Sequence, residues 1–133
     1  MTSHASGKFE VMTETHSEHK AEGASLARMS LSQHYHGGLE GSSTGEMLSA
    51  TSAVEGSAGY VAMTRFSGSL DGRSGTFIFQ HNGTMARGSG RQSFTVVPDS
   101  GTGQLAGLAG TLAVKNKDGK YFYDFEYTVE GPH

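Results

Sequence analysis

Apolar and polar residues alternate along most of the chain, which is the pattern of a half-buried β-strand. The longest alternating run spans residues 121–129, where Tyr121, Tyr123, Phe125, Tyr127 and Val129 occupy every second position. Similar runs recur between polar, glycine-containing segments, and no segment carries a helical period. The predicted strands cover residues 7–14, 26–35, 39–53, 60–66, 76–82, 93–97, 111–116 and 121–129.

The segments between these runs predict turns. Asp71-Gly72 and Asp118-Gly119 are dipeptides typical of two-residue β-hairpin turns. Residues 16–23 are polar and end in glycine, so we expect a loop there. The third strand is rich in Ser, Thr and Gly, which predicts a bent or bulged strand.

Eight strands joined by short turns, with no helix to cover a sheet face, favour closure into a barrel because closure removes both sheet edges. We therefore predict an all-β protein, a single eight-stranded antiparallel β-barrel over residues 7–130 after a flexible N-terminus over residues 1–6. An interior of this size is either filled by side chains or left open to one small ligand.

Composition and charge exclude several classes of function. The chain has 133 residues, 20 of them Gly and none Cys, so disulfides, thiol catalysis and thiolate metal sites are excluded. The net charge is −3 and no block of Lys or Arg is present, so we expect no nucleic-acid partner. No apolar run approaches the length of a membrane helix, so we expect no membrane partner and a cytoplasmic location.

Inward-facing aromatic residues are the main candidates for a binding site. If the aromatic stripe of the last strand faces inward, the inward residues of the strand over residues 76–82 are Phe77, Phe79 and His81. Tyr60 lies on the expected core face of the neighbouring strand, with Arg65 pointing outward. The candidate ligand-binding residues are Tyr60, Phe77, Phe79, His81, Tyr121, Tyr123, Phe125 and Tyr127.

The roles of these groups stay open at this point. His81 is suited to act as acid, base or hydrogen-bond donor, because its ordinary pKa lies near neutral pH, or to be a structural imidazole satisfied at the barrel rim. The tyrosines either line a ligand cavity or fill the core with their hydroxyls directed to the open end. We assign no catalytic residue and expect no cofactor.

His34 and His36 share one strand face, and Glu40 follows after a Gly-Gly pair. Two imidazoles and a carboxylate are suitable zinc ligands. No further spaced histidine accompanies them, and histidines beside a turn are commonly exposed to solvent, so we predict no metal site.

Several separated motifs resemble a bacterial family known as domain of unknown function 3224 (DUF3224). In order they are YVAM (60–63), FSGSLDGRSGTF (66–77), QHNGTM (80–85), VVPDSGTGQLAGL (96–108) and YDFEYT (123–128). The segment 96–103 is also similar to the strand and Gly-Thr-Gly turn of the allene oxide cyclase and dirigent barrel group. This resemblance implies an eight-stranded antiparallel barrel with an interior cavity, often in oligomers, and transfers no catalytic residue.

Three functions remain as hypotheses. The first is binding of a small apolar molecule in the barrel interior, oriented by His81 and tyrosine hydroxyls. The second is a cyclase or isomerase in which His81, Tyr123 or Tyr127 moves a proton on a small hydrophobic substrate. The third is a non-catalytic, homo-oligomeric interaction protein that uses an apolar outer face.

Overall fold

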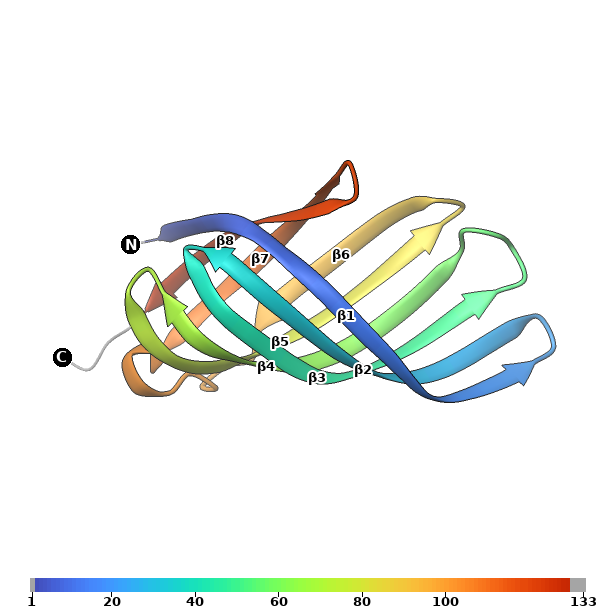
Figure 1. Ribbon diagram of the computed structural model, residues 1–133, viewed down its shortest axis with the longest axis horizontal. Coiled ribbons are helices and arrows are strands. Elements are labelled where there is room, and N and C mark those ends of the chain that lie inside the picture. Colours follow the sequence, from blue (N-terminus) through green and yellow to red (C-terminus); the bar gives the residue numbers. More distant parts are fainter. Residues whose placement is uncertain (1, 130–133) are drawn as a thin grey trace.

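The computed structural model describes residues 2–129 and is a closed antiparallel barrel (Figure 1). Each strand pairs with its neighbours in sequence, and β1 pairs with β8 to close the barrel. This confirms the predicted fold class. The strands are β1 (Ser3–Ala21), β2 (Ala24–Gly37), β3 (Leu39–Ser52), β4 (Ala58–Leu70), β5 (Arg73–Ala86), β6 (Ser89–Val96), β7 (Leu108–Lys117) and β8 (Lys120–Val129).

Two hairpins turn at the predicted dipeptides. Asp71 and Gly72 both have positive φ, at 48° and 88°, and join β4 to β5. Asp118 and Gly119 do the same, at 54° and 79°, between β7 and β8. Two successive positive φ angles match the twist of a two-residue hairpin, which is why Asp-Gly is favoured there.

Most strands are longer than the alternation predicted, and strand extends into two segments for which we predicted none. The loop expected over residues 16–23 is strand as far as Ala21, because that segment pairs with β2 up to the Ala21–Ala24 pair. The flexible segment expected over residues 1–6 belongs to β1 from Ser3 on, where pairing with β8 buries Ala5; Met1 lies outside the described residues. In both segments the backbone ladder decides the conformation.

The strand predicted to be bent or bulged over residues 39–53 contains no bulge. β3 pairs in unbroken register with both β2 and β4. The register shift of β1 lies instead between Thr15 and Ser17.

Aromatic side chains fill one half of the barrel. Phe77 lies 5.0 Å from Phe66 and 4.8 Å from Phe79 between ring centroids, and Phe79 lies 5.5 Å from Phe125. All four are fully buried. The parity expected for β4, β5 and β8 is therefore confirmed, with Arg65 exposed on the outer face.

The loop between β6 and β7 closes that filled end. It contains the short helical turn η1 (Gly103–Leu105), whose Leu105 is completely buried. Thr102 anchors the loop to β5, with its backbone N–H donating to the Thr76 carbonyl at 2.8 Å. Within residues 2–129, no helix has the length and hydropathy needed to cross a bilayer.

The opposite end is open because its seams are short. β6 and β7 pair at Phe94–Leu112 and Thr95–Thr111. The pairing of β1 with β8 ends at Phe9–Tyr121. Beyond these points the hairpins β1–β2, β3–β4 and β5–β6 extend together past the closed part of the barrel, on the right of Figure 1.

We predict that Phe125→Ala lowers the free energy of unfolding by about 3–5 kcal/mol, because it removes a buried ring and leaves a cavity. The matched control is Phe122→Ala on the same strand, where the ring faces outward and is 39% exposed. We expect the control to cost less than about 1 kcal/mol. Urea denaturation measures both, and equal losses would contradict the described orientation of β8.

Candidate functional site

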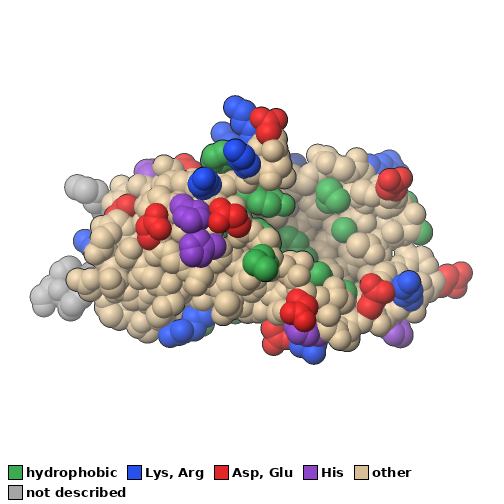
Figure 2. All heavy atoms as spheres, in the orientation of Figure 1, with side chains coloured by type: hydrophobic (Ala, Val, Ile, Leu, Met, Phe, Trp, Pro, Cys, Tyr) green, Lys and Arg blue, Asp and Glu red, His purple; other side chains and the backbone are tan. Residues whose placement is uncertain are grey.

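A cavity of about 530 Å³ occupies the open end of the barrel. Figure 2 shows it as a hollow with hydrophobic side chains on its walls, while most charged side chains lie elsewhere on the visible surface. The lining comprises Met47, Ser49, Ala50, Thr51, Ala58, Gly59, Tyr60, Gly83, Thr84, Met85, Gly88, Gly90, Arg91, Gln92, Val114, Asn116 and Tyr121.

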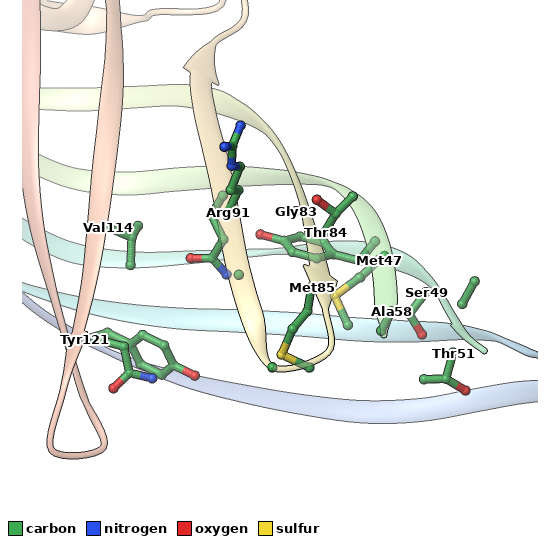
Figure 3. A pocket seen from close by; sticks show the side chains of 17 residues that line it. Met47, Ser49, Thr51, Ala58, Gly83, Thr84, Met85, Arg91, Val114 and Tyr121 are labelled. Carbon is green, nitrogen blue, oxygen red and sulfur yellow. The ribbon is translucent and has the colours of Figure 1, made fainter. Parts of the chain in front are cut away.

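Small inward residues create this space. Along β4 and β5 the inward positions change from phenylalanines in the filled half to Ala58 and Gly83 in the open half. Met47 and Met85 lie on one side of the cavity, and Tyr121 lies across from them (Figure 3). The walls are therefore mostly apolar and contain flexible thioethers that adapt to ligand shape.

The Tyr60 ring lies across Gly83, its partner on the neighbouring strand. A Cβ atom built on Gly83 would come within 2.6 Å of Tyr60 Cε1. Glycine at position 83 thus allows the ring to pack flat over β5. Burial raises the pKa of Tyr60 to about 12, so its hydroxyl stays protonated at physiological pH.

His81 lies directly beneath this tyrosine and is 1% exposed. The Tyr60 hydroxyl is 3.3 Å from His81 Nδ1, and the buried Thr64 Oγ1 is 3.5 Å from His81 Nε2. The imidazole stacks on Phe94 with ring centroids 4.2 Å apart. Burial lowers the pKa of His81 to about 4, so the imidazole is neutral at pH 7.

A second buried polar group lies on β2 and β3. Gln33 Oε1 accepts hydrogen bonds from the Tyr35 hydroxyl at 3.1 Å and the Ser43 hydroxyl at 2.9 Å. Burial raises the pKa of Tyr35 above its usual range. These side chains, like His81 and Thr64, are polar groups in an otherwise apolar interior. Burying a polar group costs free energy unless it has a hydrogen-bond partner.

The predicted site residues separate into two groups. Tyr60 and Tyr121 line the cavity, and His81 lies behind Tyr60. The remaining predicted residues belong to the buried core cluster and are absent from the lining: Phe77, Phe79, Tyr123, Phe125 and Tyr127.

The hydroxyls of the two core tyrosines on β8 are held at the closed end of the barrel. Tyr123 donates to the His36 carbonyl at 2.9 Å and accepts from the Leu39 N–H at 2.9 Å. Tyr127 donates to the Asp71 carboxylate, and burial together with this acceptor raises its pKa to about 12. These hydroxyls anchor β8 to the β2–β3 and β4–β5 turns.

Sequence reasoning missed most of the cavity wall, including Met47, Met85 and Val114. A signal for two of these residues was present in the turns. Counting outward from Asp71-Gly72 pairs Ala58 with Met85, and counting from Asp118-Gly119 pairs Tyr123 with Val114. The remaining residue, Met47, could be placed only from the register of β2 on β3, which no two-residue turn motif specifies.

The histidine pair of β2 lies on the outer surface. His36 Nε2 is 2.9 Å from Glu10 Oε1, and Glu40 instead accepts a hydrogen bond from the Gly37 N–H at 2.8 Å. His34 packs beside His36 with ring centroids 4.7 Å apart. Across residues 2–129 no group of three or more His, Cys, Asp or Glu side chains is arranged to hold a metal ion.

The fold and cavity define the class of this protein: a closed eight-stranded antiparallel β-barrel, filled by aromatic rings at one end and hollow at the other. The chain belongs to the DUF3224 family, described as a protein of unknown function, whose model matches residues 5–127.

A similar solved structure is a protein with unknown function from the DUF3224 family of Shewanella oneidensis MR-1, which is 42% identical. Its TM-score is 0.93, and the alignment covers 99% of this chain and 100% of that chain. No curated protein matches.

We predict that stability falls as pH drops from about 6.5 to 4 because of His81. The folded state keeps this imidazole neutral, whereas the unfolded chain takes up a proton at a pKa near 6.5, so the unfolded state binds more protons in this window. The contribution of His81 to the free energy of unfolding is fully present above pH 6.5 and decreases by up to about 3 kcal/mol by pH 4.

Urea denaturation of wild type and His81→Gln at pH 7, 5.5 and 4 checks this expectation. The variant lacks the titrating group, so its profile gives the pH dependence of the chain without His81. Parallel pH profiles for the two proteins would contradict a buried, neutral His81.

We predict that Gly83→Ala destabilises the fold by about 1–3 kcal/mol, because the new methyl group displaces the Tyr60 ring. Gly59→Ala is the matched control on the same cavity, since the nearest atom to its Cβ would be 3.6 Å away. Thermal or urea unfolding measures both. Equal effects would show that the ring does not lie over position 83.

Proposed function

We propose that the protein binds a small, largely apolar molecule in the cavity at the open end of the barrel. The observation that carries this proposal is an interior space of about 530 Å³ with methionine, valine and tyrosine side chains on its walls. Ligand sites in proteins have typical volumes of about 300–1,000 Å³, mostly apolar walls and a few polar groups. The aromatic core supports the site by fixing the strands that form its floor.

The chemistry of the lining favours binding over catalysis as an isomerase. The ionisable groups on the lining are Arg91 and two tyrosines, and burial raises the pKa of Tyr60 to about 12. A general acid or base works best when its pKa lies near the operating pH. Tyr60 is better suited to orient a ligand than to exchange a proton with it.

An interaction surface for a second copy of the chain ranks below ligand binding. Leu48 and Val61 are paired outward-facing residues that are 57% and 56% exposed, with Met63 nearby at 50%. Exposed apolar side chains are common on monomeric proteins and do not by themselves mark an interface. The cavity at the open end is therefore the stronger basis for a function.

We predict that Val114→Trp, which projects a large ring into the cavity, weakens binding of the fluorescent probe 1-aminoanthracene at least about tenfold. The matched control is Val61→Trp, because Val61 lies on the outer face and is 56% exposed. We expect the control to bind the probe as wild type does. Fluorescence titration measures both, and equal binding by the two variants would refute a ligand site in the barrel.

A further inference from the structure

Three buried or half-buried polar groups form a chain under the cavity. The Tyr60 hydroxyl is 3.3 Å from His81 Nδ1, and His81 Nε2 is 3.5 Å from Thr64 Oγ1. Thr64 and His81 are each 1% exposed, whereas Tyr60 lines the cavity. This series of hydrogen-bonded side chains therefore runs from the protein interior to the cavity, where it ends at the hydroxyl of Tyr60.

The positions of the protons follow from counting donors and acceptors. A neutral imidazole has one N–H donor and one acceptor nitrogen, so its two ring nitrogens play opposite roles. The Thr64 hydroxyl has His81 Nε2 as its hydrogen-bond partner among the described residues. If Nε2 carried the proton, this buried hydroxyl would have to accept it, and its own proton would have no acceptor.

The opposite arrangement satisfies every buried donor. Thr64 donates to Nε2, and the proton on Nδ1 is donated to the Tyr60 oxygen. The Tyr60 hydroxyl then acts as acceptor toward His81, and its own proton is free for another partner.

We infer that Tyr60 donates its hydroxyl proton into the cavity, and that the natural ligand is an uncharged apolar carbonyl compound whose oxygen accepts this proton. This inference rests on the proposed binding function and adds the ligand class to it. A carbonyl oxygen fits because it accepts without donating. A carboxylate fits less well, since the groups behind Tyr60 are a neutral imidazole and a hydroxyl, and a buried anion requires a compensating charge.

The cavity walls determine which chemical groups fit around the carbonyl of the ligand. Met47, Met85 and Val114 surround the space next to Tyr60, and flexible thioethers adapt to the shape of an alkyl or aryl group. Arg91, the charged residue of the lining, points away from these side chains in Figure 3. A ketone, an aldehyde or an ester with an apolar body therefore matches both the floor and the walls.

The first test needs no ligand. Nitrogen-15 NMR of the imidazoles distinguishes the two neutral tautomers, and loss of one signal set in His81→Gln assigns His81. We expect His81 to carry its proton on Nδ1 at pH 7. Protonation on Nε2 would overturn the inference, because the Tyr60 hydroxyl would then donate to Nδ1 and have no proton for the cavity.

The second test compares acetophenone with ethylbenzene, which differ by a carbonyl oxygen. Methyl-carbon NMR of methionine-labelled protein follows each titration through Met47 and Met85, which line the cavity. We expect Tyr60→Phe to weaken acetophenone binding about 3- to 10-fold and to leave ethylbenzene within about twofold. The control is Val61→Ala on the outer face, where the side chain is 56% exposed, and it should affect neither probe.

Infrared spectra of bound acetophenone provide an independent readout. We expect the carbonyl stretch to shift to lower frequency in wild type and in Val61→Ala, and to lose this shift in Tyr60→Phe. Ethylbenzene binding by Tyr60→Phe shows that the variant cavity is intact.

The outcomes separate this inference from the function on which it rests. If both probes bind wild type and Tyr60→Phe equally, the carbonyl class is wrong and the binding function stands. If neither probe binds wild type, and 1-aminoanthracene also fails, both are wrong.

Discussion

The packing of aromatic rings between the strands is the interaction on which the rest of this structure depends. Phe66, Phe77, Phe79 and Phe125 come from three strands and contact one another at one end of the barrel. Each ring removes a large apolar area from water, and together they hold the strands at the distances that barrel closure requires. Where the inward residues become small, the same sheet encloses a hollow.

The two ends of the barrel have different strand connections as well as different side chains. At the filled end, the loop carrying Leu105 and the hydrogen bonds of Tyr123 tie several turns together. At the open end, β6 and β7 separate beyond Phe94–Leu112, and the hairpins continue as paired ribbons. One end is thus suited to stability and the other to access by a ligand.

The buried polar groups lie where these two halves meet. His81 is stacked on Phe94 of the core, yet its Nδ1 faces the hydroxyl of a cavity residue. An apolar residue in this position would contribute about as much stability as the imidazole. The reason is that burying the imidazole has a desolvation cost, which its hydrogen bonds must offset. Its position is better explained by control of the hydroxyl of Tyr60, a residue that lines the cavity.

Much of the fold was determined by local sequence. Alternation on β8 and the dipeptides Asp71-Gly72 and Asp118-Gly119 specified strands, hairpins and the inward face, because side-chain direction in a strand has a period of two and a two-residue turn fixes register. The ends of the strands were less predictable: the polar segment up to Ala21 is strand because a neighbouring ladder pairs with it.

The cavity could not be read in the same way. Tyr60 and Phe79 both face inward, yet one lines a hollow and the other fills the core. The difference arises from the residues opposite them, which are contributed by strands distant in the chain, such as Val114 on β7. The sequence by itself determined which residues face the interior, whereas the tertiary structure decided which of them meet a neighbour and which meet empty space, because packing depends on the sum of side-chain volumes at each level of the barrel.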